Sequence, residues 1–222
     1  MIPHTLDILK TLIAFDTTSS KSNRALIDWV AAYLAERGIP HWLVESTDGA
    51  KANLLARIGP EVEGGILLSG HSDVVPVDGQ PWTSDPWALT QKGGKLYGRG
   101  VCDMKGFIAL SLALIDTLDA ATLQRPLMLA ITYDEEVGCL GAPHLLAQLT
   151  ALVPRLALAI IGERGDGKRA DGEILKPRAA RLRHGDGAAR MGWRRRQLPP
   201  RQGQYRHRER HCRHQLYVPQ RQ

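Results

Sequence analysis

The chain has 222 residues, enough for one large domain or two small ones, and its formal net charge is +6. The charge is unevenly distributed: residues 1–163 hold 12 Lys and Arg against 18 Asp and Glu, whereas residues 164–222 hold 17 against 5. The basic balance therefore belongs to the last part of the chain and says nothing about the partners of the first part.

Cysteine content and hydrophobicity exclude two further classes of protein. The three cysteines, Cys102, Cys139 and Cys212, do not form the pattern of a disulfide framework in a chain of this length. The first residues lack a cationic region followed by a long apolar core, so we expect no secretory signal. Because no apolar run approaches the roughly 20 residues that cross a bilayer, we expect a reduced, cytoplasmic protein without a membrane partner.

The first 60 residues predict two helices and then two strands. Apolar residues recur every three or four positions in the helical stretches, and short apolar runs follow as strands. Ser22 or Asn23 can cap the second helix at its start, and Gly38 stands where a C-terminal cap belongs. The expected elements are helices over Thr5–Phe15 and from residue 22 or 23 to about Glu36, and strands over His41–Val44 and Asn53–Ile58.

The next strand presents the first candidate functional residues. Its apolar run, Ile66–Leu68, breaks at Ser69-Gly70, as a buried strand does when it ends at a turn. His71 and Asp73 follow directly, and in extended chain both project to the same side. An imidazole beside a carboxylate at a strand end indicates a metal ligand with a carboxylate that orients it, although a turn with a capping Asp gives the same residues.

Strands and helices alternate in the rest of this part. The Trp-, Pro- and Asp-rich loop Pro76–Lys92 is long and without periodicity, and its aromatics either cover the core or contact a substrate. The expected elements after it are strands over Lys95–Tyr97, Pro126–Tyr133 and Leu156–Ile161 and helices over Lys105–Leu118 and Ala142–Leu149. This alternation predicts an α/β fold, a mainly parallel sheet with helices on both faces.

In such a sheet, ligands gather outside the carboxyl ends of the strands. Six ionisable side chains follow strands there or precede a helix: His71, Asp73, Asp103, Glu135, Glu136 and Glu163. Taken singly, Glu163 could cap a helix, Asp103 could pair with a helix dipole, and the two adjacent glutamates could form a solvated turn. Lying together, however, so many acids would resist full ionisation without cations, so the sequence predicts a metal centre.

Four motifs occur along residues 1–163: HSDVVP (71–76), GRGVCDMKG (98–106), YDEEVGCLGA (133–142) and IGE (161–163). In order and spacing they resemble the di-zinc aminoacylase/carboxypeptidase family of metallopeptidases (M20). By position, the resemblance implies that His71 and Glu163 bind one zinc, that Asp103 bridges both metals, and that Glu136 binds the second. The implied cofactors are two Zn²⁺ or Co²⁺ ions.

The same resemblance implies two catalytic residues and a reaction. Asp73 would orient the imidazole of His71, and Glu135 would be the general acid/base. The expected reaction is hydrolysis of an N-acyl amide, converting N-acetyl-L-ornithine to L-ornithine and acetate in arginine biosynthesis. N-succinyl-diaminopimelate or another N-acyl amino acid is the alternative small-molecule substrate, and full-length relatives are expected to be homodimers.

The resemblance stops after Glu163, so we expect an incomplete catalytic domain over 1–163 and a basic tail over 164–222. The tail is crowded with Arg, Gly, Pro, Ala, Gln and His and should be disordered. We interpret it as out-of-frame translation of a GC-rich gene. The rival interpretation is a non-catalytic protein that binds nucleic acid through Arg194–Arg196 and Arg206–Arg213; the main interpretation involves no nucleic acid.

In the family that the chain resembles, a last zinc-binding His follows in a later segment of the sequence. The four motifs contain no recognisable counterpart of it. The second metal would then have only Asp103 and Glu136 as protein ligands. We therefore expect weak occupancy of the second metal site and very low activity from this chain.

Overall fold

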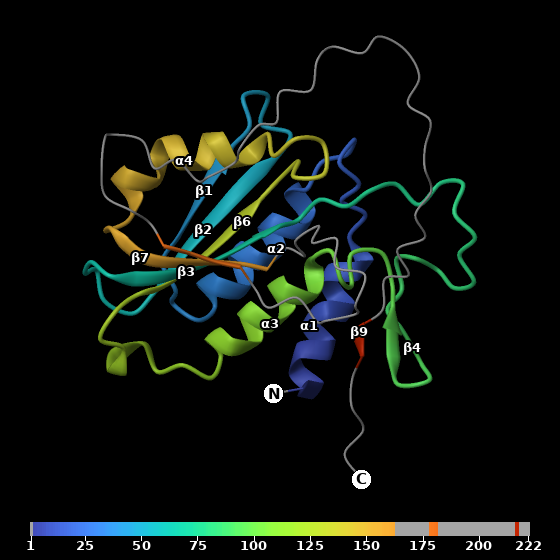
Figure 1. Ribbon diagram of the computed structural model, residues 1–222, viewed down its shortest axis with the longest axis horizontal. Helices are drawn as coiled ribbons and strands as arrows, with labels where there is room; N and C mark the ends of the chain where they lie inside the picture. Colours follow the sequence, from blue (N-terminus) through green and yellow to red (C-terminus); the bar gives the residue numbers. More distant parts are fainter. Residues whose placement is uncertain (1, 163–177, 182–215, 218–222) are drawn as a thin grey trace.

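A computed structural model describes residues 2–162, 178–181 and 216–217 (Figure 1). Glu163 is not among the described residues. Most of the basic segment 164–222, including both arginine clusters of the rival interpretation, also lies outside them. The predictions made for them stay predictions.

A six-stranded sheet forms the centre of the fold, in the order β1-β2-β6-β3-β7-β8. The central strands β6, β3 and β7 are parallel, whereas β1 pairs with β2, β2 with β6 and β8 with β7 in antiparallel fashion. The bounds are β1 His41–Glu45, β2 Ala52–Ile58, β3 Gly65–His71, β6 Leu127–Thr132, β7 Leu156–Ile161 and β8 Arg178–Arg181. The predicted parallel sheet is thus the centre of a mixed one.

Helices cover both faces of this sheet, as the sequence predicts. Helices α1 (Ile2–Ala14), α2 (Arg24–Ala35) and α3 (Lys105–Ile115) pack on one face, and α4 (Gly141–Leu152) lies on the other (Figure 1). The remaining described elements are the short 3-10 helix η1 (Ala120–Thr122) and a small sheet of β4 (Thr90–Lys92), β5 (Lys95–Tyr97) and β9 (Leu216–Tyr217).

Strand β6 shows why the central strands are apolar throughout. Leu129 and Ile131 pack into the core under the three helices, whereas Met128 and Ala130 pack on the side of α4. Side chains alternate between the two faces of a strand, and here both faces are covered. An unbroken apolar run, LMLAIT, is therefore what this position in the sheet requires.

Strand β3 is longer than predicted, and this changes where His71 lies. Ser69 and Gly70, which look like a turn in the sequence, still pair with Ala130 and Ile131 of β6. Parallel pairing on both sides outweighs the local turn preference. His71 is therefore the last residue of β3 and is fixed by the sheet, not placed in the loop after it.

The other predicted helices and strands of residues 1–162 are confirmed, with ends shifted by a few residues. Gly38 has the positive φ, +64°, of a helix C-terminal glycine. Asn23 occupies the N-cap position of α2, but its side chain makes no capping bond and instead joins Ala52 and Ser72. Within the parts of the chain that the structure describes, no helix has the length and apolarity needed to cross a membrane.

Candidate metal centre

His71 ends β3 at the edge where β3, β6 and β7 finish together. Its side chain is buried, and its two ring nitrogens face different partners. Nδ1 lies 2.9 Å from the backbone oxygen of Asp73 and 3.4 Å from its carboxylate, whereas Nε2 lies 3.0 Å from Oδ1 of Asp103. The backbone contact orients the ring so that Nε2 points at the acidic residues.

Asp103 reaches this edge from the turn that precedes α3. Gly100 has φ +83°, and a Cβ there would lie 3.0 Å from side-chain atoms of both Val74 and Lys105. The chain can therefore pass close to the end of β3 only with glycine at this position. The Asp103 side chain remains 36% exposed, so its carboxylate lies at the surface of the site beside His71.

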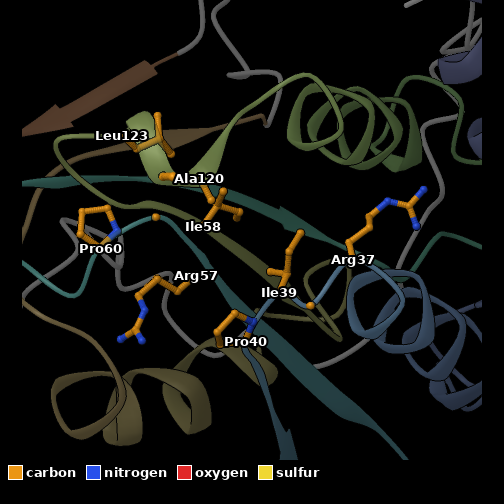
Figure 2. Close-up of a pocket in the computed structure, with 11 residues that line it drawn as sticks. Arg37, Ile39, Pro40, Arg57, Ile58, Pro60, Ala120 and Leu123 are labelled. Atoms are coloured by element: carbon orange, nitrogen blue, oxygen red, sulfur yellow. The ribbon is translucent and has the colours of Figure 1, made fainter.

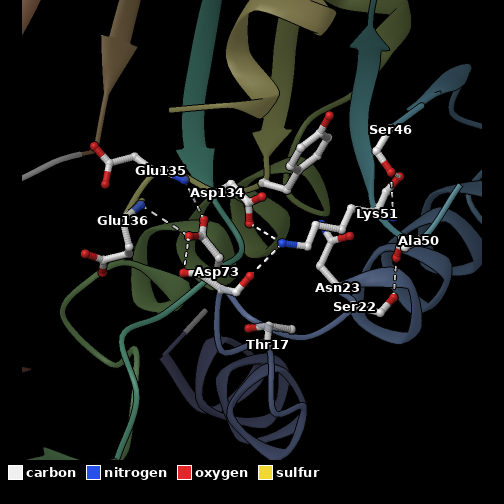
Figure 3. A network of polar contacts seen from close by, with 12 residues as sticks. Thr17, Ser22, Asn23, Ser46, Ala50, Lys51, Asp73, Asp134, Glu135 and Glu136 are labelled. Atoms are coloured by element: carbon white, nitrogen blue, oxygen red, sulfur yellow. Dashed lines mark hydrogen bonds and ion pairs between the residues drawn. The ribbon is translucent and has the colours of Figure 1, made fainter. Parts of the chain in front are cut away.

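Glu135 and Glu136 follow β6 in a tight turn. Asp134 starts the turn at φ +56°, and backbone hydrogen bonds from Gly138 and Cys139 to the Glu135 carbonyl close it. The Asp73 carboxylate accepts the backbone N–H of Glu135 at 3.0 Å and that of Glu136 at 3.2 Å. Both glutamate side chains then point away from Asp73, as Figure 3 shows.

His71, Asp103 and Glu136 form a group of possible metal ligands. One donor atom from each lies within 4.8 Å of the others. Burial, together with the neighbouring charges of Asp103, Glu135 and Asp73, raises the pKa of Glu136 to about 7, although His71 opposes this. An imidazole nitrogen and two carboxylates are ligands that suit zinc, and a cation would relieve the repulsion among the acids. The donor set therefore fits a divalent metal.

Asp73 has a wider role than orienting His71. Burial by itself would raise the pKa of Asp73, but hydrogen bonds from His71, Ser19 and the Glu135 backbone outweigh it and lower the pKa. The carboxylate thus stays ionised as an acceptor. It joins the end of β3 to the turn after β6, so the same group organises both halves of the candidate site.

Glu135 does not belong to the compact ligand group. Its Oε1 lies 3.6 Å from the Cys139 sulfur, and burial followed by the Glu135 charge raises the pKa of Cys139 to about 11. The thiol therefore stays protonated and can donate to the carboxylate.

The structure places the sequence-predicted residues as follows. It brings together His71, Asp73, Asp103, Glu135 and Glu136 at one edge of the sheet. Glu163 lies just beyond Gly162, outside the described residues, so its distance from this group is not part of the structure. The individual roles in catalysis and metal binding stay predictions.

The sequence did not reveal two residues, Ser19 and Lys51, that support the site through hydrogen bonds. Ser19 donates to Asp73 at 2.7 Å, and Lys51 donates to Asp134 at 2.5 Å. In the sequence, Ser19 belongs to a Thr/Ser run that looks only like the end of a helix, and Lys51 follows a polar turn. Neither residue type nor spacing distinguishes them, because their partners are distant in the chain.

The loop after the site packs against two buried basic side chains, Arg99 and Lys105. The Arg99 guanidinium lies 5.2 Å from the Trp82 ring, and Nζ of Lys105 lies 5.6 Å from the Trp87 ring. Arg99 also donates to the carbonyl of Pro76 at 3.1 Å. These contacts favour the interpretation of the two aromatics as a cover that is held down on the turn bearing Asp103.

A pocket of about 430 Å³ lies away from these residues (Figure 2). Its apolar lining includes Ile39, Ile58 and Leu123. Ile58 pairs with Leu127 at the start of β6, so the pocket is at the opposite edge of the sheet from His71. Of the candidate site residues that the structure describes, none lines this pocket.

Comparison with known proteins identifies the family. The model of Peptidase family M20/M25/M40 matches residues 67–196. Curated relatives include the acetylornithine deacetylase of Proteus mirabilis (strain HI4320), 41% identical over 170 residues, which cover 73% of this chain and 43% of the relative. That of Pasteurella multocida (strain Pm70) is 43% identical over 148 residues, covering 64% and 38%. The chain spans about two fifths of the length of these relatives.

Solved structures give the same fold. Human carnosine dipeptidase 1 superposes with a TM-score of 0.61 at 23% identity, covering 72% of this chain and 38% of that one. The M20 family metallo-carboxypeptidase Sso-CP2 from Sulfolobus solfataricus superposes with a TM-score of 0.57 at 26% identity, covering 72% and 37%. The family match spans more than half of the chain and includes all four motifs and all six predicted site residues. The chain therefore belongs to peptidase family M20/M25/M40.

Proposed function

We propose that this chain carries the metal-dependent hydrolytic centre of an enzyme that deacetylates N-acetyl-L-ornithine, as in arginine biosynthesis. The observation that carries the proposal is the convergence of His71, Asp103 and Glu136, with Asp73 and Glu135 alongside. The relatives named acetylornithine deacetylase support the choice of substrate. N-succinyl-diaminopimelate and other N-acyl amino acids are the alternatives within the same chemistry.

The proposed cofactors are two divalent cations, Zn²⁺ or Co²⁺. His71 and Glu163 would hold one ion, Glu136 the other, and Asp103 would bridge them. Bound there, such ions polarise the amide carbonyl and lower the pKa of a water molecule toward neutrality. The imidazole and carboxylate ligands suit both metals.

The remaining chemistry belongs to side chains of this chain. Glu135, outside the compact ligand group, would take a proton from the attacking water and deliver it to the leaving nitrogen. Asp73 would keep the His71 ring and the Glu135 backbone in fixed relation through the contacts described above.

Partners and location follow as parts of the same proposal. The substrate is a small N-acyl amino acid, the full-length enzyme is a homodimer, and the protein works in the cytoplasm. A nucleic-acid-binding role would rest on arginine clusters outside the described residues.

The experiment measures metal binding and hydrolysis separately on the purified chain. Zinc content is determined after dialysis for the unsubstituted chain, for His71→Ala and for His41→Ala, a control imidazole in β1. We expect the parent and the control to retain close to one ion per chain, because the second site is weak, and His71→Ala to retain little. Losing a residue that only orients a metal ligand typically costs about 10- to 100-fold in affinity, and losing the ligand itself should cost at least as much.

Hydrolysis of N-acetyl-L-ornithine and N-succinyl-diaminopimelate is then assayed with Glu135→Gln and with Glu63→Gln, an exposed control. We expect slow release of ornithine that Glu135→Gln abolishes and Glu63→Gln leaves unchanged. A parent chain that binds no zinc, or that binds it equally well after His71→Ala, would show that the metal centre is wrong. Preference for the succinylated substrate would overturn only the substrate assignment.

A further inference from the structure

A closed ring of polar contacts lies behind the metal centre (Figure 3). The Ser19 hydroxyl donates to Asp73 at 2.7 Å, and the other oxygen of Asp73 accepts the N–H of Glu135 at 3.0 Å. The residue before it, Asp134, accepts from Nζ of Lys51 at 2.5 Å. Lys51 closes the ring by donating to the Ser19 carbonyl at 2.6 Å.

The ring joins four segments that are distant in sequence. Ser19 comes from the stretch between α1 and α2, Lys51 precedes β2, Asp73 follows β3, and Asp134 follows β6. No single element can set the distances between these segments. Backbone pairing joins β2 and β3 to β6, and the Ser19 N–H donates to the Val74 carbonyl. The ring adds side-chain contacts that connect all four segments at the edge where the metal centre lies.

The charged members of the ring are shielded from water. Asp73 and Asp134 are buried, and the Lys51 and Asp134 side chains are only 17% and 11% exposed. Electrostatic contacts are stronger in such surroundings than at the surface, and removing one partner leaves the other charge buried and uncompensated. The Lys51–Asp134 pair is therefore expected to restrain its two segments firmly.

The Lys51–Asp134 pair affects the metal centre through the backbone of Asp134. Its φ of +56° lies in the left-handed region, which side-chain-bearing residues adopt at an energetic cost. This conformation turns the chain so that the next two N–H groups, of Glu135 and Glu136, both face Asp73. By holding the Asp134 side chain, Lys51 stabilises the backbone from which a candidate ligand and the candidate acid/base project.

We propose that Lys51 and Ser19 are positioning residues of the metal centre, which fix the Glu135–Glu136 turn against Asp73 and so raise its affinity for a divalent cation. Neither residue belongs to the group of candidate ligands. The part of this inference that concerns the cation rests on the proposed function. The part that concerns the turn does not.

The same segment supplies a matched control. Lys21 also pairs with an aspartate, Asp16, at 2.5 Å, but these side chains are 59% and 30% exposed. Exposed pairs of this kind contribute little. Lys21→Met therefore removes the same charge and the same type of contact without affecting the ring.

The test compares Lys51→Met, Lys51→Arg, Ser19→Ala and Lys21→Met with the parent chain. Amide hydrogen exchange is followed in the metal-free protein at Glu135 and Glu136, with Leu129 in the core of β6 as an internal reference. Zinc affinity is measured by competition with a chromophoric chelator. A purely stabilising role would speed exchange at all three amides alike and would leave the affinity of folded molecules unchanged.

We expect Lys51→Met to speed exchange at residues 135 and 136 by about tenfold relative to Leu129 and to weaken zinc binding by about tenfold. Ser19→Ala should change both in the same direction, Lys51→Arg should recover most of the loss, and Lys21→Met should match the parent. If Lys51→Met does not fold, Ser19→Ala decides by the same two measurements.

Unchanged relative exchange at both amides in Ser19→Ala and in any folded Lys51→Met overturns the proposal, whatever the zinc result. If the parent binds no zinc but the exchange pattern appears as expected, the proposed function fails and the positioning of the turn is upheld. If the parent binds zinc and all variants bind it equally, the proposed function stands and the role in affinity is refuted.

Discussion

Replacing Asp73 by asparagine is the sharpest test of how this edge of the sheet is held together. The Asp73 side chain is 2% exposed, and both of its carboxylate oxygens act as acceptors. Oδ1 takes the N–H of Glu135, and Oδ2 takes the N–H of Glu136 and the Ser19 hydroxyl. An amide of the same shape has only one acceptor oxygen, and its NH₂ group must face the donors on the other side.

The loss of stability in Asp73→Asn follows from these contacts. In either orientation of the amide, a buried backbone N–H of the 135–136 turn loses its acceptor and meets another donor. Leaving one buried donor unsatisfied costs about 1–3 kcal/mol, and the bond that survives loses its charge assistance. We therefore expect Asp73→Asn to lower the free energy of unfolding by about 2–4 kcal/mol, a large share of the roughly 5–15 kcal/mol of a typical domain.

Urea unfolding of the metal-free chain, followed by far-ultraviolet circular dichroism, measures this loss. Asp78→Asn is the control, because Asp78 is exposed in the following loop and such changes usually stay within about 0.5 kcal/mol. If the Asp73→Asn and Asp78→Asn variants unfolded at the same urea concentration, the acceptor role of Asp73 would contribute nothing to stability. That result would refute the reasoning.

Two further predictions concern other parts of the fold. A Cβ at Gly141 would lie 2.5 Å from the Tyr133 carbonyl oxygen and 2.7 Å from Oδ1 of Asn53. Gly141→Ala should therefore lower the free energy of unfolding by about 1–3 kcal/mol, measured in urea, despite the helix preference of alanine. A variant as stable as the parent would contradict this. Burial would raise the pKa of Asp116, but hydrogen bonds from Arg37, Tyr33 and His4 outweigh it and lower the pKa. Because the folded-state pKa is below the unfolded one, this stabilisation is complete above the unfolded pKa and is lost as pH falls through the folded pKa. Asp116→Asn should cost about 1–2 kcal/mol at pH 7, and its difference from the parent should close below about pH 4; a difference that stays constant from pH 7 to pH 3 would show that the ionised carboxylate is not the cause.

The sequence was sufficient for the elements whose local pattern and tertiary setting agree. The apolar run at 156–161 predicts β7 with the observed bounds, because nothing in it competes with strand pairing. At Ser69-Gly70 the local signal and the sheet disagree, and pairing with β6 prevails. Asn23 illustrates the same limit: its type predicts a helix cap, but the nearby β2 and Ser72 offer its side chain stronger partners.

Some residues of the candidate site could likewise be predicted from the sequence, and others could not. His71, Asp103 and Glu136 were predictable because metal-binding side chains recur in motifs whose order carries a family resemblance. Ser19 and Lys51 were not, because a serine hydroxyl and a lysine amine have no spacing that reveals their partners. Only the fold brings Ser19 to Asp73 and Lys51 to Asp134.

The two tryptophans of the loop after β3 have a practical consequence. Trp82 and Trp87 stand over the side chains of Arg99 and Lys105, which flank Asp103 within a few residues. Indole emission responds to the polarity and charge around the ring, and the Arg99 guanidinium lies 5.2 Å from the Trp82 ring. Two of the chain's five tryptophans therefore stand where a rearrangement of the 99–105 turn would change their fluorescence without an attached label.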